Sequence, residues 1–94
     1  MRAESQRALK AVLQREEDDI VWLMEDARGR RVVRRLLDQS RMHHSSWSSN
    51  ALEMSRNEGR REFGVALLAV VARACPDAYV QMLQERWKDE TPGS

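Results

Sequence analysis

Apolar residues recur along this chain every three to four positions, and the repeat is clearest between residues 28 and 41. On a helix at about 100° per residue, one side of this segment carries Val32, Val33, Leu36 and Leu37. The opposite side carries Arg28, Arg31, Arg34 and Arg35, with Arg30 beside them. The pattern predicts a helix over about 27–39 that buries its valines and leucines and presents a strip of guanidinium groups outward.

The N-terminal quarter of the chain predicts two helices. The first covers 3–17, and its narrow apolar stripe consists of Ala8, Leu9, Val12 and Leu13. We expect this stripe to pack on its own domain, with docking on another protein as the alternative. The acidic pair 18–19 precedes an apolar run, which is typical of a helix start, so a short second helix is expected over 20–24. Trp22 in that run is expected to anchor the core, with an exposed binding role as the alternative.

The middle of the chain predicts a polar loop between two helices. Asp26 is placed to cap the 27–39 helix, and residues 40–50 form a serine-rich connection without a clear period. Trp47 lies among these serines, where it either fills the core or contacts a partner. Asn50 has Glu53 three residues on, a capping-box pattern that predicts a helix start.

Residues 60–73 are the predicted central hydrophobic helix. From Phe63 onward they are apolar on every side of the helical wheel, which indicates a helix surrounded by others. Gly59 and the two residues before it are expected to interrupt the helix ahead of this segment. Pro76 suits the first turn of a last helix. One face of that helix carries Tyr79, Val80, Leu83 and Trp87.

These elements predict an all-α fold, a small bundle of four to five helices around the central helix at about 60–73. A chain of 94 residues suggests one domain, here 1–94. Its N-terminal helix, 1–17, is expected to be peripheral, and residues 90–94 are expected to form a flexible tail.

Charge changes this picture by its distribution rather than by its total. One third of the residues are charged, yet the net charge is only +1, which argues against a dedicated DNA-binding domain. Between 16 and 26 lie six acids and no base, whereas between 28 and 41 lie six arginines and one acid. Segments of opposite charge can pair within the fold or with another copy of the chain, so a homo-oligomer is a candidate assembly.

Two features bear on where the protein is made. Cys75 is the only cysteine, so no disulfide can form within the chain and a reducing compartment is expected. The N-terminus lacks the apolar segment of a signal peptide, and the longest apolar run, 63–72, has ten residues against the roughly 20 that span a bilayer. We expect a protein that is soluble and intracellular when made, with no membrane partner.

No motif for bond-making chemistry is found in the sequence. There is no glycine-rich phosphate loop, no metalloprotease motif and no Cys–His pair at a familiar spacing, so we expect no enzyme, no catalytic residues, no cofactor and no small-molecule substrate. His43 and His44 are adjacent and point apart on most backbones, so no metal site is expected. The arginine strip can be interpreted in three ways: as a solvated face neutralised by nearby acids, as a surface for an acidic partner, or as a nucleic-acid contact.

Several blocks follow one another with the spacings of a known family. They are Asp19-Ile-Val-Trp-Leu-Met24, Gly29-Arg-Arg-Val-Val-Arg-Arg-Leu-Leu37, Asn57-Glu-Gly-Arg-Arg61, Ala66-Leu-Leu68, Pro76-Asp-Ala-Tyr79 and Met82-Leu83. Over about 18–85 the chain resembles a family of small proteins encoded among the structural genes of tailed bacteriophages, first named from a Bordetella podophage.

The resemblance implies a virion-associated structural protein that binds other proteins in a head, portal, tail or ejection assembly. Its location would be the virion, and the cytoplasm of the bacterial host during assembly. The expected partners are other phage structural proteins, the chain itself and packaged DNA. Arg30, Arg31, Arg60 and Arg61 match the family pattern and are expected to make contacts. With the neighbouring side chains they complete the predicted partner-binding set, Arg30, Arg31, Arg34, Arg35, Arg60, Arg61 and Trp47.

Two other functions use the same polarised surface. A phage-encoded inhibitor of a host or defence complex would act through charge mimicry. A nucleic-acid-binding regulator would place the 28–41 helix on duplex phosphates, with an affinity that falls steeply with salt.

Overall fold

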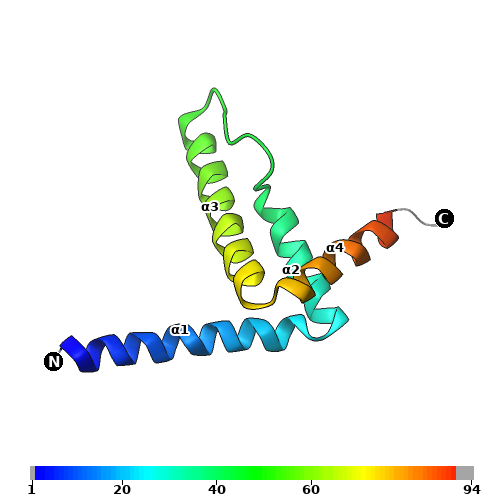
Figure 1. Ribbon diagram of the computed structural model, residues 1–94. Coiled ribbons are helices and arrows are strands. Elements are labelled where there is room, and N and C mark those ends of the chain that lie inside the picture. The colour runs from blue at the N-terminus through cyan, green and yellow to red at the C-terminus, as the bar shows by residue number, and fades with distance from the viewer. Residues whose placement is uncertain (1, 91–94) are drawn as a thin grey trace.

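The computed structural model describes residues 2–90, and within them the chain forms four helices and no strand (Figure 1). The helices are α1 (Arg2–Met24), α2 (Ala27–Ser40), α3 (Ala51–Ala74) and α4 (Pro76–Glu90). The predicted all-α fold is confirmed. The tail expected over 90–94 lies outside the described residues beyond Glu90.

Two predicted helix breaks are absent. Asp18 and Asp19 lie inside α1 as exposed side chains, and Gln14 Nε2 donates to Asp18 Oδ1 at 3.0 Å one turn away. Gly59 lies inside α3. Extending an existing helix costs far less than nucleating a new one, and a single interior glycine costs only about 1 kcal/mol. The predicted short helix over 20–24 and the predicted interruption near Gly59 are therefore both wrong.

The predicted helix boundaries at caps are confirmed. The Asp26 side chain accepts from the Arg28 backbone N–H, and Asn50 Oδ1 accepts from Leu52 and Glu53. Pro76 is the first residue of α4, and the residue before a proline is disfavoured in helical backbone, which ends α3.

Within the described part of the chain, no single helix is both long and apolar enough to span a membrane. The helices α3 and α4 reach that length and composition only together, across a bend of 118°.

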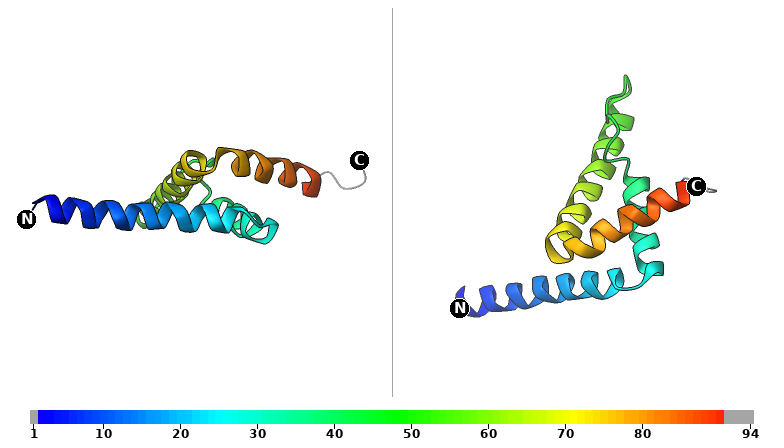
Figure 2. Two further views of the ribbon diagram at one scale, coloured as in Figure 1. Left: turned by 60° about the horizontal axis from the view of Figure 1, so that its bottom comes forward. Right: turned by 45° about the vertical axis from the view of Figure 1, so that its right-hand side comes forward.

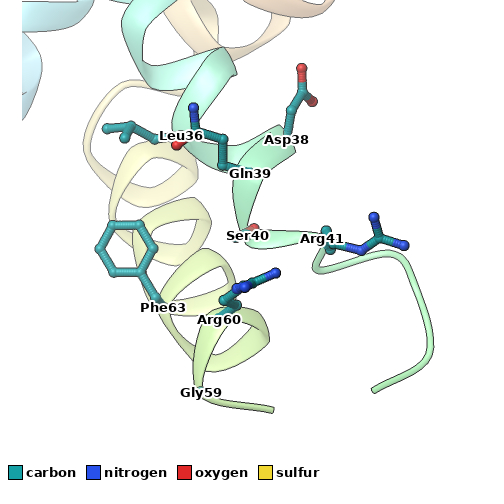
Figure 3. Close-up of a pocket in the computed structure, with 8 residues that line it drawn as sticks. All are labelled: Leu36, Asp38, Gln39, Ser40, Arg41, Gly59, Arg60 and Phe63. Atoms are coloured by element: carbon teal, nitrogen blue, oxygen red, sulfur yellow. The ribbon is translucent and has the colours of Figure 1, made fainter. Parts of the chain in front are cut away.

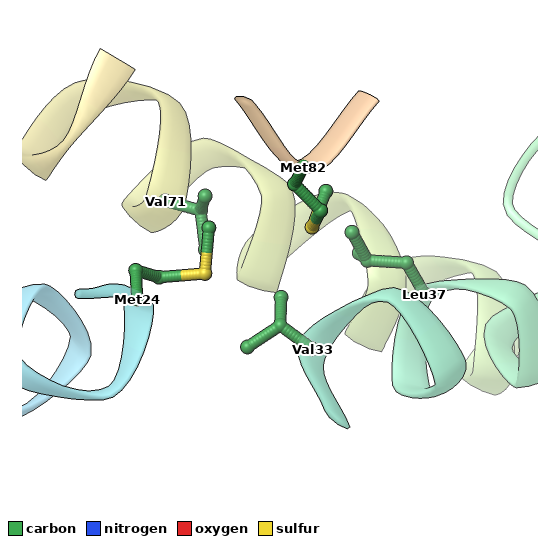
Figure 4. Close-up of a cluster of buried hydrophobic side chains, with 5 residues drawn as sticks. All are labelled: Met24, Val33, Leu37, Val71 and Met82. Carbon is green, nitrogen blue, oxygen red and sulfur yellow. The ribbon is translucent and has the colours of Figure 1, made fainter. Parts of the chain in front are cut away.

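The core is small and lies where all four helices meet (Figure 4). Its buried side chains are Met24, Val33, Leu37, Val71 and Met82. Every helix contributes at least one of them, so the core depends on all four elements being in place.

The orientation of the helices differs from the wheel predictions. In α2 the buried line includes Gly29, Arg30 and Ser40, whereas Val32 and Leu36 remain 40% and 38% exposed. In α3, which contacts the three other helices, only Gly64 and Val71 are buried, so the prediction of a helix covered on every side is wrong. The predicted α4 face also stays largely open, with Val80 at 50%, Leu83 at 42% and Trp87 at 68% exposure, whereas Met82 is buried.

Trp22 is 72% exposed, so the prediction that it anchors the core is wrong as well. It lies in the last turn of α1, two residues before Met24, which is the buried residue there. The neighbouring helices approach α1 from the side of Met24, whereas an indole two residues earlier points about 200° round the helix.

The molecule is thin and extended. Its principal dimensions are 56 × 39 × 16 Å and its radius of gyration is 16.5 Å, against about 12 Å for a compact domain of this length. The N-terminal half of α1 projects beyond the other helices in all three views (Figures 1 and 2). Every residue from 2 to 16 is exposed, so the predicted packing of this stripe on its own domain is wrong.

Two glycines permit close approach between elements. A Cβ on Gly29 would lie 1.7 Å from the Leu23 carbonyl oxygen, so only glycine lets α2 start this close to the end of α1. A Cβ on Gly64 would lie 2.0 Å from Ser40 Oγ, where α3 passes the end of α2. Gly59, in contrast, faces open space.

Gly29→Ala and Gly59→Ala therefore make a matched pair. Gly29→Ala is expected to destabilise the fold by about 2 kcal/mol or more, because the obstructing atom is backbone and cannot rotate away. Gly59→Ala is expected to be neutral or to stabilise by up to about 1 kcal/mol, because alanine is the better helix former. Urea unfolding followed by circular dichroism checks both, and equal effects at the two positions would contradict the close-approach argument.

Candidate interaction surface

The arginine strip predicted on α2 is divided between the interior and the surface. Arg30 is only 6% exposed and points into the junction of three helices. Its Nε and Nη2 donate to the two carboxylate oxygens of Glu85 on α4, each at 2.9 Å. Its Nη1 donates to the carbonyl oxygens of Met24 at 2.9 Å and Glu25 at 3.1 Å. The prediction that Arg30 lies on the outward strip is wrong.

The surroundings of Arg30 account for its burial. The last carbonyls of a helix have no partner within that helix, and a cation at this end also suits the helix dipole. The guanidinium of Arg30 satisfies such carbonyls at the end of α1 while its other edge pairs with Glu85. This pairing holds the pKa of the Glu85 carboxyl below its ordinary value, mainly through the hydrogen bonds from Arg30.

Arg34 is also turned toward α4. Its Nη2 donates to Asp89 Oδ2 at 2.6 Å, and its side chain is 16% exposed. A third ion pair joins the same two helices in the opposite sense, from Arg86 on α4 to Asp38 on α2. Two arginines of α2, Arg30 and Arg34, are therefore paired with carboxylates of α4, and neither forms an ion pair with the acidic segment 16–26 next to them in sequence.

The remaining predicted arginines lie on the surface. Arg31, Arg35 and Arg60 are exposed and form no ion pair with the residues that the structure describes, whereas Arg61 pairs with Glu58 one turn earlier at 3.4 Å. Arg31 and Arg35 follow the outer side of α2. These are the guanidinium groups that remain available for a partner.

Arg60 lies at a groove between the end of α2 and the middle of α3 (Figure 3). The groove is open, with a volume of about 740 Å³. Leu36 and Phe63, 38% and 54% exposed, form its apolar wall, and Arg41 and Arg60 extend from its other side. Asp38 at its edge is already engaged by Arg86, so the two arginines leave the groove electropositive.

Sequence reasoning missed Leu36 and Phe63 as groove residues, because it assigned both to the core. Arg41 was part of the basic segment, but its position depends on the left-handed backbone conformation at the end of α2, with φ 53°. A residue of this kind ends the helix and redirects the chain, which moves the Arg41 side chain out of the helical repeat. No periodic signal in the sequence reports that change of direction.

The loop between α2 and α3 holds Trp47 at the surface. Ser46 fixes the loop, since its hydroxyl donates to Glu58 and its carbonyl accepts from Asn57 at 3.4 Å. Trp47 itself is 74% exposed. Of the two alternatives for this side chain, filling of the core is excluded, and contact with a partner stays a prediction.

Among the described residues, the titratable groups with a shifted pKa are the ion-paired Arg30, Glu85 and Arg86, together with Cys75. Among residues 2–90, no three His, Cys, Asp or Glu side chains gather where they could hold a metal ion. Cys75 is half-buried, and burial raises the pKa of its thiol, which keeps it protonated and weakly nucleophilic. The arrangement offers charge and apolar area to a partner.

The chain belongs to the Bbp19-like phage protein family, whose model matches residues 20–84. This range covers the last five residues of α1, all of α2 and α3, and the part of α4 that ends one residue before Glu85. The protein is therefore a phage protein, as the blocks in the sequence indicated. Neither the curated proteins nor the solved structures give a significant match.

Replacement of Arg30 tests its structural role. Arg30→Met is expected to cost about 3 kcal/mol of unfolding free energy, because it leaves Glu85 and two helix-end carbonyls without their donor. Arg30→Lys is expected to recover only part of this loss, since one ammonium cannot reproduce the planar fork. The exposed Arg31→Met is the control and should stay within about 0.5 kcal/mol. Equal costs at 30 and 31 in urea unfolding would contradict the burial of Arg30.

The Glu85 pair also predicts an acid-sensitive stability. Since the pKa of Glu85 is lower in the folded than in the unfolded chain, its contribution is complete above about pH 4.5 and is lost as the pH falls through the folded value. The unfolding free energy should therefore fall below pH 4.5 in the native chain, and this fall should be smaller in Glu85→Gln. Urea titrations between pH 3 and pH 6 measure both slopes, and parallel curves would refute the pairing.

Proposed function

We propose that this phage protein is a virion-associated structural component that acts by binding other phage proteins in a head, portal, tail or ejection assembly. Its groove between α2 and α3 would receive a segment of such a partner. We further propose that the protein carries out no catalysis.

The observation that carries this proposal is the amount of surface left uncovered. The chain exposes 7,495 Å², whereas a compact monomer of 10.9 kDa exposes about 5,600 Å². The excess includes large apolar side chains that a domain of ordinary shape would bury. Proteins that function inside an assembly expose such surface until their neighbours cover it.

The groove indicates what kind of segment it would take. Leu36 and Phe63 offer apolar contact, and the guanidinium groups of Arg41 and Arg60 bind carboxylates with fixed geometry. An acidic segment that carries a bulky apolar side chain satisfies both. Trp47 and the outer arginines of α2, Arg31 and Arg35, would extend the contact.

A protein partner is favoured over nucleic acid by the state of the arginines. Arg30 and Arg34, two of the side chains on which phosphate binding by α2 would depend, are held by carboxylates of α4. A phosphate backbone would have to compete with Glu85 and Asp89 for them. Binding to packaged DNA would therefore be left to the exposed arginines alone.

Purified virions test the proposal. Mass spectrometry of particles separated by sedimentation is expected to find the protein at a fixed copy number per particle. In a phage that encodes Arg41→Glu/Arg60→Glu, the protein is expected to be lost from the particles, because both groove cations become repulsive to an acidic partner. Arg7→Glu/Lys88→Glu changes the net charge equally at exposed positions outside the groove and should be retained.

Two outcomes would overturn the proposal. One is absence of the native protein from both mature particles and assembly intermediates, which would favour action on a host complex. The other is equal retention of the groove variant and its control, which would move the contact to another surface. Circular dichroism of each purified variant confirms that the charge changes leave the fold intact.

A further inference from the structure

The first half of α1 carries an apolar stripe that residues 2–90 of the chain leave exposed. Leu9, Val12 and Leu13 are 59%, 41% and 50% exposed and point to one side of the helix. This half projects beyond the other helices in Figures 1 and 2, and its residues 2–16 are all exposed. An isolated helix of this length is marginal in water, so the projecting half needs a partner to be stable.

The same side of α1 continues into a second groove, between α1 and α3. Ile20 and Leu23 of α1 face Leu67 and Val70 of α3 across it, and its volume is about 540 Å³. Its rim on α1 carries two carboxylates, Glu16 and Asp19. The exposed stripe and the acid-rimmed groove therefore form one apolar line along α1.

The charges of α1 divide at its midpoint. Residues 2–15 carry four basic side chains and one acid, and residues 16–19 are all acidic. At about 100° per residue, Lys10 and Arg15 flank the apolar stripe, as Asp19 flanks the groove. Arg7 and Asp18 lie on the far side of the helix. One half of the line is therefore apolar with basic edges, whereas the other half has one carboxylate at its edge and a second, Glu16, on the line itself where the stripe meets the groove.

We propose that α1 pairs with α1 of a second copy of this chain, antiparallel, along this apolar line. The basic-edged stripe of each copy enters the acid-rimmed groove of the other, so the two contacts are identical and related by a two-fold axis near the middle of the helix. A surface that is complementary to itself in this way is what a two-fold dimer requires. A parallel pair would place like charges opposite each other.

The available area suits such a dimer. A standard interface buries about 800 Å² on each partner, and the chain exposes roughly 1,900 Å² more than a compact monomer. Pairing along the 23 residues of α1 uses part of this excess and leaves the groove at Leu36 and Phe63 open. The inference stands apart from the proposed attachment to a phage assembly and is tested on the purified protein alone.

Light scattering after size exclusion tests the dimer with the full-length chain. The native protein is expected at twice its 10.9 kDa mass at micromolar concentration and low salt, with dissociation as salt rises. Lys10→Glu/Arg15→Glu makes the edges of α1 acidic throughout, and Glu16→Lys/Asp19→Lys makes them basic. Each variant alone is expected to be monomeric.

Mixing the two variants provides the decisive measurement. The acidic α1 of one and the basic α1 of the other are complementary at both ends, so the equimolar mixture is expected to return to twice the chain mass. Arg7→Glu and Asp18→Lys are the controls, because they change the same two halves on the far side of α1, and both should remain dimeric. Glu17 is left unchanged because it pairs with Arg73 within the fold.

Three results would overturn the inference. If the native protein is monomeric, the apolar stripe does not pair with a second copy and must bind a different partner. A native dimer that both edge variants preserve would place the contact on another face. Failure of the mixture to associate, with both variants shown to be folded by circular dichroism, would remove the charge complementarity on which the antiparallel arrangement depends.

Discussion

The fold depends on one buried guanidinium group. Arg30 joins the end of α1, the start of α2 and the side of α4 through four hydrogen bonds, three of its nitrogens taking part. The apolar core beside it has only five buried side chains, with partly buried side chains packed around them. The guanidinium group adds hydrogen bonds with fixed directions, because its planar N–H groups donate to their partners in one geometry.

The sequence predicted well what local chemistry decides. The caps at Asp26 and Asn50, the stop before Pro76 and the polar loop all depend on neighbours a few positions away, and the structure confirms them. The family blocks led correctly to a phage protein. The wheel argument was weaker for Arg30 and Val32, because periodicity shows which side chains share a direction but not where the neighbouring helices lie. Only the close approach at Gly29 and the position of Glu85 decide that Arg30 faces inward and Val32 outward.

The two Gly-Arg-Arg blocks illustrate the same limit. In the first, Gly29 lets two helices touch and Arg30 binds across the junction. In the second, Gly59 faces open space and Arg60 lines an exposed groove. Identical triplets thus serve the interior at one site and the surface at the other. The difference comes from the elements that pack against each triplet, which are far away in sequence. The triplet alone therefore does not predict whether its arginine is buried or exposed.

The projecting half of α1 has a consequence for the dynamics of a single copy. Its residues are exposed, so opening its amides disrupts little packing within the described part of the chain, whereas opening amides of α2 also disrupts the packing of that helix on α1, α3 and α4. Hydrogen exchange in a lone chain therefore divides α1 in two, with fast exchange before residue 16 and slow exchange after it. The boundary falls close to Glu17, which forms an ion pair with Arg73 of α3.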